Sequence, residues 1–221
     1  MGLRHHNIID EMDLEQKCAL LSGATAFGTR AYPDLGIPEL QFSDGPHGMR
    51  HQDPNAANHL GIGGSIPATC FPTAVTVANS WDPALAEELG RALGEEAVDQ
   101  GVNVVLGPGL CIKRSPLCGR NFEYLSEDPL LAGKMGAGYV RGIQSSGVSA
   151  CPKHFAANSQ ETRRQASDSV LDERTLREIY LSAFETVVRE ARPKTIMTSY
   201  NKVNGSYANE NPLPAQGHPA R

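Results

Sequence analysis

The chain has 221 residues, 40% of them hydrophobic and 20% charged, which is an ordinary composition for a soluble globular protein. The formal charge of -5 is mild and its signs are interspersed, so we expect no nucleic-acid-binding face and no charged interaction tail. No apolar run approaches the ~20 residues that span a bilayer, and no N-terminal segment has the pattern of a secretory signal, so a cytoplasmic protein is expected.

The first predicted helix begins after Asp13, because Asp13 and Gln16 have the spacing of a capping box. We expect this helix to end at Gly23 and to place Leu14 and Leu21 on one apolar face. A loop rich in glycine and proline follows.

From residue 40 onward, short apolar runs alternate with helix signals. Asp82-Pro83 and Asp128-Pro129 each combine an N-cap residue with a proline at the first helical position. Asp172 caps a fourth predicted helix that ends at Pro193. The apolar stripe of this fourth helix has four-residue spacing: Leu176, Tyr180, Phe184 and Val188. Strands are predicted at residues 40–42, 74–78, 102–106, 148–151 and 195–199. Such alternation predicts an α/β fold with parallel strands.

Polar side chains stand where these predicted strands end. Asp44 follows the first strand, and Arg120 lies in the loop after residues 102–106. Lys153 and His154 end another strand, and Tyr200 ends the last. Ligands of parallel sheets lie at the carboxyl ends of the strands. A carboxylate that accepts bonds and cations that donate them suit a ligand made largely of hydroxyl groups, whereas Asp44 would repel a phosphorylated one. The alternative is a Lys-His strand end that simply faces water.

Other kinds of site are disfavoured. The sequence has no complete nucleotide-binding glycine fingerprint and no Gly-x-Ser-x-Gly elbow. Four glycines within a predicted helix favour close packing of that helix against a strand: Gly133, Gly136, Gly138 and Gly142. Three histidines lack partners at a zinc-site spacing, so no metal and no cofactor are expected: His47, His51 and His59.

The cysteines are odd in number and are interpreted as reduced, mostly buried thiols: Cys18, Cys70, Cys111, Cys118 and Cys151. Asn204-Gly-Ser206 is expected to form a turn.

Four motifs carry a resemblance to a known family. They are Ser43-Asp-Gly-Pro-His-Gly-Met-Arg50, Gly119-Arg-Asn-Phe-Glu-Tyr-Leu-Ser-Glu-Asp-Pro129, Lys153-His-Phe-Ala-Ala-Asn-Ser-Gln-Glu161 and Ser199-Tyr-Asn-Lys-Val-Asn-Gly205. In this order they resemble glycoside hydrolase family 3, of the β-glucosidase type, over about residues 8–212. The resemblance implies an α/β fold of the incomplete TIM-like (β/α)8 barrel kind, with about the first five βα units. Residues 1–212 are expected to form this partial N-terminal barrel domain, and residues 213–221 an atypical tail.

The resemblance also implies roles for individual residues. Asp44 should hold ring hydroxyls of a terminal, non-reducing β-D-glucosyl unit, and the other hydroxyls should be gripped by Arg120, Lys153 and His154. Tyr200, Arg164 and Met197 should border the catalytic centre. An ion pair of Arg164 with Glu161 or Asp168 is the alternative for that arginine. The implied substrate is a small-molecule β-glucoside or an oligosaccharide.

No catalytic residue is assigned within the chain. A retaining glycosidase needs two carboxyl groups about 5–5.5 Å apart, and the resemblance implies a nucleophile Asp and an acid/base Glu beyond the last residue of this sequence. Residues 213–221 contain two prolines and a glycine where the family would continue into a helix. We therefore expect the chain to be truncated and inactive alone.

Several alternatives stay open at this point. The chain could be a non-catalytic sugar-binding remnant or a truncated gene product, in which open barrel edges favour self-association. Another β-glycosidase specificity, such as that of a xylosidase, is a further alternative. The N-acetylhexosaminidase branch is less favoured, because residues 155–161 contain no second histidine.

Overall fold

The structure is a computed structural model that describes residues 5–53 and 64–211. The helices in these ranges are α1 (His6–Glu11), α2 (Leu14–Ala19), α3 (Ala74–Ala78), α4 (Pro83–Asp99), α5 (Pro129–Ser145), α6 (Glu173–Thr175) and α7 (Ser182–Ala191), with short 3-10 turns η1 (Pro33–Leu35) and η2 (Asn121–Glu123) and a π-helical turn η3 (Leu176–Tyr180). The strands are β1 (Phe42–Ser43), β2 (Val104–Val105), β3 (Ser149–Ala150), β4 (Asp168–Ser169), β5 (Lys202–Val203) and β6 (Ser206–Tyr207). Residue His59 and the predicted tail 213–221 lie outside the described residues.

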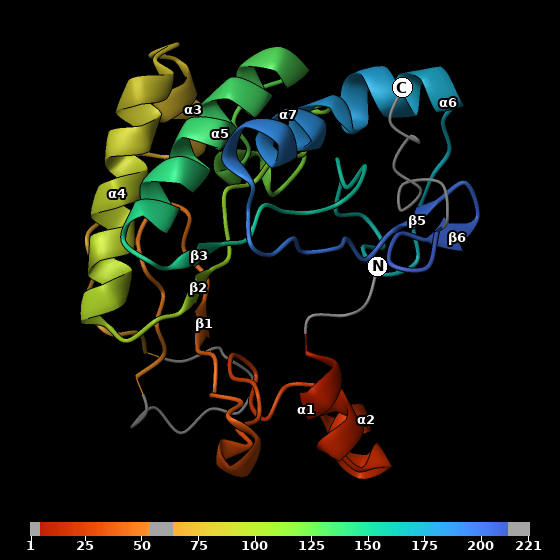
Figure 1. Cartoon of the computed structure of the whole chain (residues 1–221). Coiled ribbons are helices and arrows are strands. Elements are labelled where there is room, and N and C mark those ends of the chain that lie inside the picture. The colour runs from red at the N-terminus through yellow and green to blue at the C-terminus, as the bar shows by residue number, and fades with distance from the viewer. Residues whose placement is uncertain (1–4, 54–63, 212–221) are drawn as a thin grey trace.

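A parallel sheet in the order β1-β2-β3 positions the site (Figure 1). Its register places Phe42 opposite Val104 and Val104 opposite Ser149. The helices α4 and α5 connect successive strands, and Val105 packs with them in the main apolar core. Val104 belongs to a separate apolar cluster on the other side. Parallel strands covered by their own connecting helices confirm the predicted α/β fold and form part of a barrel.

The next strand position is only partly formed. Residues 195–199 make one parallel bridge, between Phe155 and Thr198, and the Met197 amide donates to the Pro152 carbonyl at 3.0 Å. With β1, β2 and β3, this gives four successive strand positions in the described ranges.

The strand predicted at residues 74–78 is wrong, because this segment is the helix α3. Its buried residues are Ala74, Val77 and Ala78, which have the i, i+3, i+4 spacing of one helical face. Val75 is 39% exposed. A five-residue apolar run fits a strand and a short helix equally well by pattern, so four of the five predicted strand segments remain.

The predicted N-caps are confirmed. The Asp82 carboxylate accepts from the Ala84 and Leu85 amides at 2.9 and 3.2 Å. The Asp128 carboxylate accepts from the Leu130 amide at 2.8 Å. Both aspartates lie at the same end of the sheet as the site loops, so they fix where the two covering helices begin.

The helices predicted to begin after Asp13 and after Asp172 differ from the sequence prediction. The capping box of Asp13 is present, but α2 already ends at Ala19, and Leu14 and Leu21 are 77% and 90% exposed. The helix that starts after Asp172 contains the π-helical turn η3. A π turn adds a residue, which rotates the following apolar face. Within α7, positions four residues apart drift around the helix axis, so Val188 is 44% exposed although Phe184 is buried.

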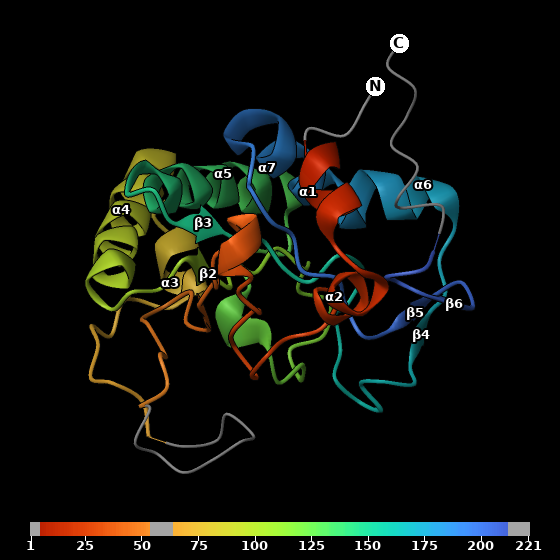
Figure 2. The same ribbon diagram turned by 60° about the horizontal axis from the view of Figure 1, so that its bottom comes forward.

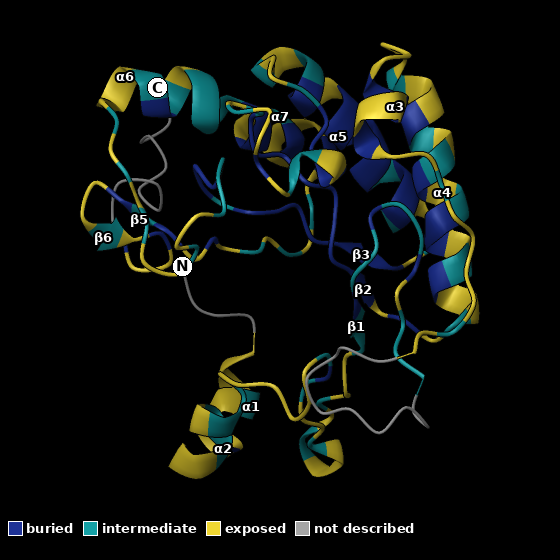
Figure 3. Ribbon diagram, turned by 180° about the vertical axis from the view of Figure 1, so that it is seen from behind, coloured by how far each residue is buried: buried dark blue, intermediate teal, exposed yellow. Residues whose placement is uncertain are grey.

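The helix α5 is the most deeply buried ribbon in Figure 3, and its glycines permit this. A Cβ atom on Gly142 would lie 2.1 Å from the Glu87 carbonyl oxygen, and one on Gly138 would lie 2.3 Å from that of Pro83. Gly133 instead faces Thr186 of α7. Close packing is thus confirmed, but these glycines approach the helices α4 and α7 rather than a strand.

A second small sheet, β4-β5-β6, lies apart from β1-β2-β3 (Figure 2). Strand β5 pairs in parallel with β4 and antiparallel with β6. Asn204 and Gly205 join β5 to β6, and both have positive φ, at 51° and 89°. This is the backbone of a tight hairpin, so the predicted turn is confirmed.

Candidate functional site

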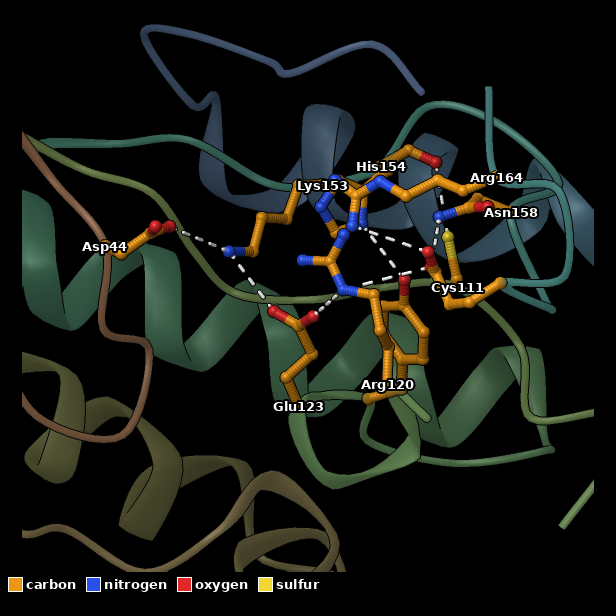
Figure 4. Close-up of polar contacts among 10 residues, drawn as sticks. Asp44, Cys111, Arg120, Glu123, Lys153, His154, Asn158 and Arg164 are labelled. Carbon is orange, nitrogen blue, oxygen red and sulfur yellow. Dashed lines mark hydrogen bonds and ion pairs between the residues drawn. The ribbon is translucent and has the colours of Figure 1, made fainter. Parts of the chain in front are cut away.

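The polar side chains that follow the parallel strands come together in one place (Figure 4). Asp44 directly follows β1, and Lys153 follows β3. The Lys153 ammonium lies 3.4 Å from the Asp44 carboxylate. Because the two residues are far apart in the sequence, the sheet is what brings them into contact.

Lys153 also contacts a second carboxylate. Its Nζ lies 3.1 Å from Oε2 of Glu123, and the side chains of both residues are 3% exposed. Asp44 is more accessible, with 35% of its side chain exposed. A buried ammonium therefore sits between one buried and one accessible carboxylate, and only Asp44 has much surface to offer a ligand.

Arg120 joins the same group from the loop after β2. Its Nε pairs with the other Glu123 oxygen and lies 3.9 Å from Oε1 of Glu161. Its Nη1 is buried and has no hydrogen-bond partner among the described residues. Burial alone would lower the pKa of Arg120, but the Glu123 carboxylate outweighs it and raises that pKa, so the guanidinium stays charged.

His154 is buried beside these cations and is neutral. Burial, and then the charges of Arg120 and Lys153, lower the pKa of His154 to about 2. Its Nδ1 lies 3.0 Å from the Tyr124 hydroxyl, whose own pKa burial raises well above its ordinary value. A neutral imidazole has one N–H donor and one acceptor nitrogen, so His154 can exchange hydrogen bonds without adding a third positive charge.

Arg164 and Tyr200 lie at the other end of the group. The Arg164 Nη1 is 3.4 Å from Oε2 of Glu161, and the guanidinium stacks over the Tyr200 ring at 4.6 Å. The ion pair with Glu161 considered from the sequence is therefore present. Asp168 is used elsewhere, since its carboxylate accepts from the Gly205 amide at 3.1 Å.

Met197 has different surroundings. It is partly buried in an apolar cluster with Val104, Leu106 and Cys151. No polar contact ties its side chain to the charged group in the described ranges. The predicted role of Met197 beside the catalytic centre stays a prediction.

Six charged side chains of alternating sign therefore run through the site. In order of contact they are Asp44, Lys153, Glu123, Arg120, Glu161 and Arg164. Three carboxylates balance three cations, so the group can lie partly buried without a large net charge. An accessible carboxylate acceptor and an unpartnered guanidinium donor have the chemistry to hydrogen-bond hydroxyl groups.

Known proteins share this fold and much of this sequence. Residues 56–221 match the model described as the glycosyl hydrolase family 3 N terminal domain. The chain belongs to glycosyl hydrolase family 3. The thermostable beta-glucosidase B of Acetivibrio thermocellus is 53% identical over 211 residues, which are 96% of this chain and 28% of that protein. The exo-alpha-(1->6)-L-arabinopyranosidase of Bifidobacterium longum is 47% identical over 203 residues, 92% of this chain and 27% of that protein.

Solved structures agree with this family 3 membership. Beta-glucosidase 3B from Thermotoga neapolitana, in complex with glucose, superposes with a TM-score of 0.85 at 41% identity, covering 93% of this chain and 30% of that one. The chain thus spans less than a third of the length of these family 3 relatives.

Two residues central to this family 3 site were missed from the sequence. Glu123 was not assigned a role, although it lies three residues after Arg120 in a quoted motif. Glu161 was considered only as a partner of Arg164, and it also accepts from Asn158 Nδ2 at 3.1 Å. Buried cations need carboxylate partners, and this requirement could have identified both Glu123 and Glu161.

Other features of the family 3 chain do not compete with this site. A hollow of about 560 Å³ opens at the opposite ends of the strands, beside Val102, Val148 and Thr195, and the six charged residues do not line it. Residues 5–53 and 64–211 contain neither a helix that could cross a membrane nor a group of three metal-binding side chains.

Proposed function

We propose that this chain supplies the sugar-holding part of a retaining β-glucosidase-like hydrolase that acts on terminal, non-reducing β-D-glucosyl residues. The observation that supports it is the contact of Lys153 with the accessible Asp44 at the carboxyl edge of the sheet. In this proposal Asp44 accepts bonds from two adjacent ring hydroxyls, and the surrounding cations donate to their neighbours. The similarity to beta-glucosidases over nearly all of this chain favours the same ligand class.

The remaining predicted site residues complete the proposal. His154 offers its single N–H to a hydroxyl, and Tyr200, held by Arg164, forms an edge of the sugar site. Met197 borders it from the apolar side. Residues 1–212 act as the barrel unit that holds these groups.

We further propose that these residues bind the sugar without cleaving it. Each site carboxylate is already paired with a cation: Asp44 with Lys153, Glu123 with Lys153 and Arg120, and Glu161 with Arg120 and Arg164. Such pairing suits holding and positioning. A double displacement needs a free nucleophile and an acid/base about 5–5.5 Å apart, and we assign both to parts of the enzyme other than these residues.

The test is thermal unfolding of the 221-residue chain with and without glucose. We expect glucose to raise the melting temperature of the wild-type chain and of Asp10→Ala, an exposed control, because a ligand that binds the folded state stabilises it. Asp44→Ala should lose this shift. No shift in the wild-type chain, or an equal shift in Asp44→Ala, would contradict the proposal.

Hydrolysis is tested separately with an aryl β-glucoside. We expect the wild-type chain to release the aglycone no faster than the Lys153→Ala variant, which defines the background rate. Turnover clearly above that background would show that the chain carries its own nucleophile.

A second candidate is binding of a different pyranoside. The relative from Bifidobacterium longum is named for L-arabinopyranose, a sugar without the hydroxymethyl group of glucose. Parallel melts with glucose, L-arabinose, xylose and N-acetylglucosamine rank these sugars. The largest shift with glucose supports the first proposal, and the largest with L-arabinose supports the second.

Location and assembly complete the proposal. All five cysteines are free thiols, and Cys18 and Cys70 are exposed, which favours a reducing, cytoplasmic setting. Unpaired strand edges favour self-association. Size-exclusion chromatography over a concentration series tests this, and a concentration-independent monomer would contradict it.

A further inference from the structure

Glu123 lies at the middle of the charged group and is almost inaccessible. Its side chain is 3% exposed, with one oxygen paired to Arg120 Nε and the other 3.1 Å from Lys153 Nζ. A buried carboxylate is costly unless cations and hydrogen bonds compensate it, and here both oxygens are compensated. Because each of its oxygens already pairs with a cation, Glu123 has no unengaged oxygen to offer a ligand.

The pairing with Glu123 orients Arg120. The guanidinium is planar and rigid, so fixing the direction of Nε also fixes the directions of both terminal nitrogens. Nη1 is buried without a partner among the described residues. Such an orphaned donor is expensive until a ligand oxygen accepts from it, so the pairing leaves one donor reserved for a ligand.

Glu123 also holds Lys153 when Asp44 is engaged elsewhere. The ammonium has two carboxylate neighbours, and only Asp44 is accessible, at 35% exposed. If Asp44 turns its oxygens to ligand hydroxyls, the buried Glu123 still compensates the Lys153 charge. The ammonium can then donate to the same ligand without being left unpaired.

We propose that Glu123 is a positioning residue that aims Arg120 and Lys153 at a hydroxyl-rich ligand without touching it. This inference rests on the proposed sugar-binding function. When no ligand is bound, the Glu123 carboxylate keeps the two cations side by side, where their mutual repulsion would otherwise drive them apart.

The first experiment needs no sugar. The Nε–H signal of Arg120 is recorded by NMR in the 221-residue chain and assigned with Arg120→Lys. We expect Glu123→Gln to shift and broaden this signal, because the charged acceptor of Nε is gone, and Glu123→Asp to give a smaller change. Glu185→Gln, which breaks the exposed pair with Arg189, should leave the Arg120 signal unchanged. An unchanged signal in Glu123→Gln would overturn the inference. If Glu123→Gln does not fold, Glu123→Asp decides, and a wild-type signal in that variant would overturn it.

The second experiment measures glucose affinity by titration calorimetry. We expect Glu123→Gln to raise the dissociation constant for glucose about 10–100-fold, the effect of losing one charge-assisted hydrogen bond. Glu123→Asp should recover part of the lost affinity. A lower melting temperature with an unchanged dissociation constant would mean that Glu123 is only structural. If the wild-type chain binds no glucose, the proposed function fails, while the Arg120 signal still decides whether Glu123 orients the cations.

Discussion

The Lys153 ammonium lies 3.1 Å from the Glu123 carboxylate in surroundings that leave each side chain 3% exposed. Such buried pairs add little net stability compared with apolar residues, because desolvation offsets their attraction. Removing one partner is different, since it leaves an uncompensated buried charge. The pair therefore fits a role in holding site geometry better than a role in stabilising the fold.

We expect Lys153→Met to lower the free energy of unfolding by about 3 kcal/mol, because Glu123 loses one of its two cations. Adding Glu123→Gln should recover part of that loss. Urea unfolding measures both effects. The control is Lys134→Met, which breaks the exposed pair with Glu190 and should cost at most about 1 kcal/mol. Equal costs for the two lysine variants would refute the buried-pair description.

His154 makes stability depend on pH. Its folded-state pKa of about 2 lies below the ordinary histidine value of 6.5, so the unfolded chain binds the proton first as the pH falls. The stabilising contribution is fully present above about pH 6.5 and is lost progressively as the pH falls toward about 2. Between pH 7 and 5 the loss should be about 2 kcal/mol.

The measurement for His154 is urea unfolding at pH 7 and pH 5 in the wild type and in His154→Asn, which lacks the titrating ring. We expect the wild type to lose about 2 kcal/mol more than the variant over this interval. The same pH dependence in both proteins would show that other groups cause it.

The contact between α4 and α5 can be tested at Gly142. An added Cβ would meet the Glu87 carbonyl oxygen at 2.1 Å, so we expect Gly142→Ala to destabilise the chain by about 1–3 kcal/mol. Gly119→Ala is the matched control, because nothing lies within 4 Å of its added Cβ. A stabilised or neutral Gly142→Ala in thermal unfolding would mean that the helices lie farther apart.

Local rules predicted much of the fold. Asp82, Asp128 and Asp13 act as helix caps because a side-chain acceptor next to free amides is a local requirement. Residues 74–78 were predicted incorrectly because five apolar residues do not distinguish a strand from a short helix. The π turn at residues 176–180 could not be predicted, since four-residue spacing carries no sign of an inserted residue.

The candidate site could be predicted in part. The rule that ligands lie at the carboxyl ends of parallel strands pointed to Asp44 and Lys153, which the structure brings together. The contacts of Glu123 and Glu161 depend on how the loops after β2 and β3 fold over each other. Spacing within either loop does not specify those contacts, so both carboxylates were passed over.

Glucose titration of the 221-residue chain, followed by amide chemical shifts, tests the sugar-binding account most directly. We expect saturable shifts centred on the loops that carry Asp44, Arg120 and Lys153, and their loss in Asp44→Ala. Shifts confined to the opposite ends of the strands, around Val102 and Val148, or no saturable shifts at all, would contradict the account.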